Sequence, residues 1–125
     1  MRYTTYSNER RRRIEIAAHR ATRQTHFQVF NLRGTSWKSC WCGSWFGHYW
    51  NFSGVMRETC ARLGCSNAAS VGAHVRLADR RSSRRTYIVP LCSACNHWRN
   101  DEAMFIDSRT ALVSANVSLT CAALD

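Results

Sequence analysis

The sequence has little that would place the protein in a membrane or a secretory pathway. Its 125 residues contain no apolar run long enough for a membrane-spanning helix. The residues after Met1 also lack the apolar stretch of a signal peptide. We therefore predict a cytoplasmic protein that does not bind membranes. Close cysteine pairs in a reducing compartment are typical of metal binding rather than disulfides.

Lysine and acidic residues are both scarce. Lys38 is the only lysine among 18 basic residues, there are 8 acidic residues, and the formal net charge is +10. Arginine contacts phosphate through two parallel hydrogen bonds and stacks on bases, which suits nucleic acid. The composition therefore favours nucleic acid as a partner. A surface that is only well solvated, or one that docks an acidic protein, is the alternative.

Two arginine clusters are the candidate nucleic-acid contacts. The first is Arg10, Arg11, Arg12 and Arg13. It lies in residues 1–23, which we interpret as a basic arm or a short helix capped by Ser7. An arm that orders on a polyanion and a frayed terminus both remain open. The second cluster is Arg80, Arg81, Arg84 and Arg85, at the tip of a predicted hairpin.

Residues 24–125 are expected to form a single zinc-binding domain. Alternating side chains predict strands at 25–32 and 86–91, with a partner strand around 74–77. Pro90 lacks an N–H and should lie at a strand end or edge. The seven aromatic residues between 35 and 54 should mostly pack into a core, with a base-stacking platform as the alternative. The tail from Ser108 predicts one or two short strands.

Four cysteines form the most specific motif. Cys60-x4-Cys65 and Cys92-x2-Cys95 are two close pairs separated by a hairpin-length segment. Such pairs can close four thiolates around one tetrahedral zinc ion. Gly72 should allow the chain to approach closely before the strand at His74. A helix is expected to begin at Cys92 and to run through about Phe105.

The remaining cysteines suggest a second metal site. Cys40, Cys42 and Cys121 are left after the four above, and His48 is near the first two in sequence. Three thiolates and one imidazole would form a closed Cys3His site. The alternative is that these cysteines are small buried apolar residues.

Residues 60–99 resemble the HNH endonuclease superfamily, whose ββα-metal enzymes often carry a treble-clef zinc. The matching segments are Ala73-His74-Val75, Leu91-Cys92-Ser93-Ala94-Cys95 and Asn96-His97. The resemblance covers about a third of the chain. It implies a small α+β domain with an HNH-like core at about 60–105. The N-terminal strand and the aromatic-rich segment would be additions to that core.

The resemblance also implies a catalytic constellation. His74 would be the general base that activates water, and Asn96, with His97 as the neighbouring candidate, would bind a catalytic Mg²⁺ or Mn²⁺. Ala73 stands where the family has a further metal ligand, and Tyr87 lies near its orienting Asn. A purely structural His74 therefore stays open.

We predict a zinc-stabilised nucleic-acid-binding protein of HNH-like descent, and leave metal-dependent phosphodiester cleavage open. The alternative is a catalytically inactive interaction module. Such a module would act as an inhibitor or accessory subunit of a nucleic-acid-processing complex.

Overall fold

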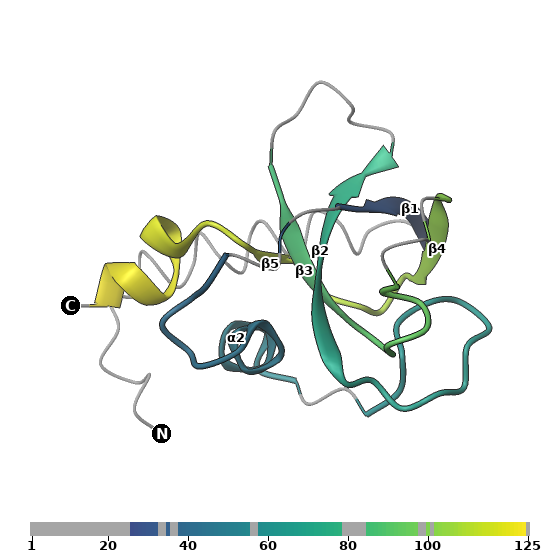
Figure 1. Ribbon diagram of the computed structural model, residues 1–125, viewed down its shortest axis with the longest axis horizontal. Helices are drawn as coiled ribbons and strands as arrows, with labels where there is room; N and C mark the ends of the chain where they lie inside the picture. The colour runs from purple at the N-terminus through teal and green to yellow at the C-terminus, as the bar shows by residue number, and fades with distance from the viewer. Residues whose placement is uncertain are drawn as a thin grey trace.

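The computed structural model describes residues 26–32, 35, 38–55, 58–78, 85–97, 100 and 102–124. These residues form a small α+β domain with a five-stranded antiparallel sheet of order β4-β1-β2-β3-β5 (Figure 1). The strands are β1 (His26–Asn31), β2 (Val71–Leu77), β3 (Tyr87–Leu91), β4 (Met104–Asp107) and β5 (Val113–Ser114). The other elements are helix α2 (Trp45–Ser53) and the 3₁₀ helices η3 (Val117–Leu119) and η4 (Cys121–Leu124). Among the described helices, none has the length and apolar character needed to cross a bilayer.

Strand β3, which lies between β2 and β5, is buried at all five residues. Successive side chains of a strand point to opposite faces, so β3 serves two packed layers. Val89 and Leu91 pack in one cluster with Cys60 and Cys92. Ile88 packs in the other with side chains of α2 and β5, including the buried Tyr49. The cysteine turns therefore cover one face of the sheet, and α2 covers the other.

Helix α2 begins and ends with two capping residues. The Ser44 side chain accepts a hydrogen bond of 2.9 Å from the Gly47 amide, and Gly54 ends the helix at a φ of 72°. The expected packing of the aromatic segment is confirmed for Tyr49, whereas Trp41 and Trp50 are 63% and 45% exposed. The segment thus supplies part of the core and also presents indole rings to solvent.

The close approach expected at Gly72 is confirmed, and its partner is α2. A Cβ at this position would lie 2.3 Å from the carbonyl carbon of Trp45 and 2.6 Å from the amide nitrogen of Phe46. The first turn of α2 therefore rests directly on the backbone of β2. Only glycine leaves room for this contact.

The predicted strands at 25–32, around 74–77 and at 86–91 are confirmed as β1, β2 and β3. Pro90 lies near the end of β3, beyond Tyr87 and Ile88, the two residues that pair with β5. Its missing N–H therefore interrupts no ladder there, and its carbonyl accepts a hydrogen bond of 2.8 Å from the Ala61 amide.

The predicted helix from Cys92 to about Phe105 is wrong. Residues 93–96 form turns, and Met104–Asp107 form β4, which pairs with β1. Met104 and Ile106 are buried while Phe105 is exposed, which is the two-residue period of a strand. In the tail, one short strand is confirmed as β5. Beyond it, 3₁₀ helices replace the expected alternation, and the Asn116 side chain caps η3.

Several predicted features lie outside the described residues. They are the arm at 1–23 with Arg10, Arg11, Arg12 and Arg13, and the hairpin-tip residues Arg80, Arg81 and Arg84. Arg85, the last residue of that tip cluster, is described and is exposed.

Candidate metal centres

The side chains of Cys60, Cys65, Cys92 and Cys95 meet in one cluster, with all four sulfurs within 4.8 Å of one another. The Cys65 sulfur lies 3.9 Å from the sulfurs of both Cys92 and Cys95. A tetrahedral site with zinc–sulfur bonds of about 2.3 Å has sulfur–sulfur edges of about 3.8 Å, whereas a disulfide measures about 2.05 Å. The spacing is therefore that of a tetrathiolate metal site, and these residues can hold zinc.

The Cys60–Cys65 turn is held against the end of β3 by its own backbone. The Cys65 amide donates to the Arg62 carbonyl at 3.0 Å, and Gly64 adopts a φ of 83° that favours glycine. The Ala61 amide donates to the Pro90 carbonyl, two residues before Cys92. This contact brings the first cysteine pair to the second.

Backbone and side-chain donors surround the second pair. The Cys95 amide donates to the Cys92 sulfur at 3.4 Å, and the Asn67 side-chain amide lies 3.7 Å from the same sulfur. The side-chain amides of Asn31 and Asn100 donate to the Cys95 carbonyl at 3.1 and 2.8 Å. Such donors stabilise thiolate charge and orient metal ligands.

The electrostatics of the cluster suit a bound cation. Burial raises the pKa of Cys92, but the Cys95 amide and the Asn67 side chain outweigh it and lower the pKa to about 6. Burial, together with the neighbouring Cys92, raises the pKa of Cys95 to about 12. One thiolate is thus favoured by the protein alone, whereas a full set of four requires a positive ion.

A second group at the start of α2 consists of Cys40, Cys42 and His48, whose ligand atoms lie within 4.8 Å of one another. Burial raises the pKa of Cys42 to about 12, and burial lowers the pKa of His48. These three residues can also hold a metal ion. The fourth residue expected from the sequence, Cys121, places its sulfur 3.7 Å from Nδ1 of His48.

His74 lies under α2. The residue is 4% exposed, and its ring meets the Trp45 ring edge-on at a centroid distance of 4.5 Å. Its Nε2 has no hydrogen-bond partner within the described part of the chain. Burial, followed by the charges of Lys38 and His48, lowers the pKa of His74 to about 4. The side chain is therefore a neutral imidazole shielded from water.

The other residues of the implied catalytic set lie in different surroundings. Asn96 and His97 are in the turn that follows Cys95, and the Asn96 amide donates to the Cys92 carbonyl at 3.0 Å. Ala73 packs with the cysteine-side cluster, so alternation along β2 directs His74 toward the opposite face. Catalysis by His74 with Asn96 or His97 stays a prediction, and Ala73 contributes no ligand.

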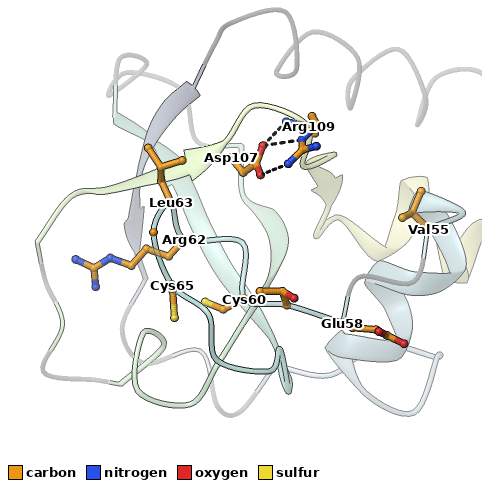
Figure 2. A pocket seen from close by; sticks show the side chains of 10 residues that line it. Val55, Glu58, Cys60, Arg62, Leu63, Cys65, Asp107 and Arg109 are labelled. Carbon is orange, nitrogen blue, oxygen red and sulfur yellow. Dashed lines mark hydrogen bonds and ion pairs between the residues drawn. The ribbon is translucent and has the colours of Figure 1, made fainter.

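A cavity of about 560 Å³ adjoins the first cysteine pair, and Figure 2 shows the residues that line it. Asp107 accepts hydrogen bonds from Nη2 and Nε of Arg109 at 3.2 and 3.4 Å. The exposed side chains of Leu63 and Val55 also line the cavity. Sequence reasoning missed this site because its lining comes from separate parts of the chain, between Val55 and Cys65 and at the end of β4.

Comparisons of the chain with protein-family models, with curated proteins and with solved structures gave no match.

Proposed function

We propose that this protein is a zinc-stabilised nucleic-acid-binding module of HNH-like descent. The observation that carries the proposal is the tetrathiolate cluster in a chain with a net charge of +10. Four thiolates fill every position of a tetrahedral zinc, which is typical of a structural site. The zinc would act by fixing the fold that presents the arginines.

The position of the cluster indicates what the zinc would stabilise. Cys92 follows β3 directly, and Val71 of β2 pairs with Leu91 at the same end of the β2–β3 hairpin. The connection at the other end of the hairpin contains four arginines in the sequence. Zinc would therefore clamp the open end of the β2–β3 hairpin.

Binding without cleavage agrees best with these sites. A closed tetrathiolate zinc has no position for a reactive water. His74 is buried against Trp45 with a lowered pKa, and Ala73 offers no metal ligand. A nuclease would need the general base and the catalytic metal ligands to share access to the phosphodiester.

Salt-dependent binding tests this proposal. Affinity for duplex DNA, single-stranded DNA and RNA would be measured by fluorescence anisotropy between 50 and about 300 mM salt. Replacing Arg80, Arg81, Arg84 and Arg85 by Gln should reduce the salt slope by up to about 3.6, because each of the four phosphate contacts contributes about 0.9. A matched variant with Gln at Arg33, Arg57, Arg99 and Arg109 loses the same charge outside the arm and the hairpin tip and should change the slope less.

Two results would contradict the proposal. One is absence of binding to all three nucleic acids at about 50 mM salt, the lowest concentration tested, where phosphate contacts are strongest. The other is equal loss of affinity in both arginine variants, which would mean that net charge alone decides binding.

A protein-interaction module is the second candidate, and the exposed Trp41 and Trp50 favour it. Exposed indole rings are common at the centres of protein interfaces. If so, the wild type should bind a protein partner even after nuclease treatment. Replacement of both tryptophans by Ala should abolish that binding and leave the affinity for nucleic acid unchanged.

A further inference from the structure

The environment of His48 fixes which ring nitrogen is free. Its Nε2 lies 2.9 Å from the Ser114 carbonyl oxygen, which can only accept a hydrogen bond. Nε2 therefore carries the proton, and Nδ1 presents its lone pair. A histidine that donates one nitrogen to a backbone carbonyl is typical of a metal ligand whose other nitrogen binds the ion.

The lone pair of Nδ1 faces two sulfurs at equal distance. The sulfurs of Cys42 and Cys121 each lie 3.7 Å from Nδ1. A single lone pair can accept a hydrogen from only one thiol. For a tetrahedral zinc with bonds of about 2.05 Å to nitrogen and about 2.3 Å to sulfur, the nitrogen–sulfur edge is about 3.6 Å. A cation between the three atoms explains both contacts.

A tight turn supplies the remaining ligand. The ligand atom of Cys40 lies within 4.8 Å of those of both Cys42 and His48. Between the two turn cysteines, the Trp41 amide donates to the Cys121 sulfur at 3.3 Å. An amide donor to sulfur stabilises a metal-bound thiolate, as at the first cluster.

We propose that Cys40, Cys42, His48 and Cys121 bind a second zinc ion, and that this ion fastens the C-terminal segment to α2. Of the two 3₁₀ helices in that segment, η3 has no buried residue, whereas Cys121 of η4 is buried. Short 3₁₀ helices have weak hydrogen-bond geometry and need outside support. Figure 1 shows η3 and η4, in yellow, at the end of the domain opposite β4. The second zinc would be their anchor.

Metal content measured on the full chain tests the proposal. Zinc per chain would be determined by inductively coupled plasma mass spectrometry after purification with excess zinc and removal of free ion. We expect two zinc ions in the wild type and one in Cys121→Ser and in Cys40→Ser. Cys40 is only half-buried, so its replacement should leave the fold intact even where Cys121→Ser unfolds. Ser118→Ala, an exposed change in the same segment, should keep two.

Hydrogen exchange of residues 117–124 distinguishes anchoring of the C-terminal segment by zinc from anchoring by side-chain packing alone. The segment should exchange faster in Cys40→Ser than in Ser118→Ala, while β3 stays protected. Cobalt substitution should give a three-sulfur, one-nitrogen spectrum that Cys40→Ser removes. One zinc in the folded wild type, or two in both cysteine variants, would overturn the site. Unchanged exchange of 117–124 in Cys40→Ser would overturn the anchoring role.

Discussion

Replacing Gly72 by Ala should destabilise the protein strongly. The added methyl carbon would lie 2.3 and 2.4 Å from the carbonyl carbon and oxygen of Trp45. Ordinary contacts are about 3.5–4 Å, so α2 would have to move by roughly 1 Å. Because the first turn of α2 carries Trp45 and His48, that movement also disturbs the edge contact with His74 and the hydrogen bond to Ser114.

The expected loss combines two effects. Overpacking of a tight interior contact costs about 1–3 kcal/mol, and a weakened buried hydrogen bond adds about 1 kcal/mol. We therefore expect about 3 kcal/mol, a large share of the ~5–15 kcal/mol by which most domains are stable. Urea unfolding, followed by tryptophan fluorescence with zinc present, should show a midpoint lowered by about 1–2 M.

Gly47→Ala is the matched control. Its methyl would meet the Ser44 side-chain oxygen at 3.2 Å, and its backbone is helical. The gain in helix propensity of about 1 kcal/mol offsets this tighter contact, so a change within about 1 kcal/mol is expected. A Gly72→Ala protein as stable as Gly47→Ala would refute the close packing of α2 on β2.

Three further changes test other parts of the structure. His74 has a pKa of about 4 in the folded protein and about 6.5 in the unfolded chain. Between these two pH values the unfolded chain binds a proton that the folded protein does not, so the free energy of unfolding falls as the pH is lowered. Lowering the pH from 7.5 to 5.5 should thus cost the wild type about 1 kcal/mol more than His74→Leu, and equal losses in urea unfolding would contradict the lowered pKa. Asn31→Ala removes a donor to the Cys95 carbonyl and should cost about 1 kcal/mol and speed zinc loss to a chelator, whereas an unchanged rate would exclude a supporting role. Replacing Arg10, Arg11, Arg12 and Arg13 by Gln should lower the salt slope of DNA binding by up to about 3.6, and an unchanged slope would exclude contacts by these arginines.

The cysteine pairs, two of the strands and the positions of Pro90 and Gly72 were predictable, because each depends on residues that are close in sequence. Cysteine spacing indicated the Cys60–Cys65 and Cys92–Cys95 pairs, because two thiols on one short turn have few other uses in a reducing compartment. Alternation of side chains along the sequence predicted β1 and β3, and the missing N–H of Pro90 predicted its position near a strand end. Gly72 was recognised as a close approach, although its partner was not.

The helix and the fourth strand were missed for physical reasons. Residues 45–53 are aromatic around much of the helix and include Gly47, so no clear apolar stripe or strong helix propensity marks α2. Met104–Asp107 is too short for its alternation to outweigh the helix expected from Cys92 onward. Its pairing partner β1 also lies far away in sequence. Long-range pairing of this kind is decided by the whole fold.

The second cysteine group shows an intermediate case. Counting the unused ligands led to His48 and Cys121, which are 73 residues apart. The proton position on His48 depends on the Ser114 carbonyl in β5, a contact that sequence spacing does not contain. The grouping of Cys40, Cys42 and His48 was therefore predictable, whereas the orientation of the His48 ring required the structure.

Zinc titration into metal-free protein tests the central claim most directly. Near-ultraviolet circular dichroism and amide dispersion in NMR spectra would be followed as zinc is added to the reduced chain. We predict that the metal-free chain lacks fixed tertiary structure and that the β-sheet forms as the four-cysteine cluster fills, because ligand closure and folding are coupled. A metal-free chain with the full native spectrum, unchanged by zinc, would contradict the account.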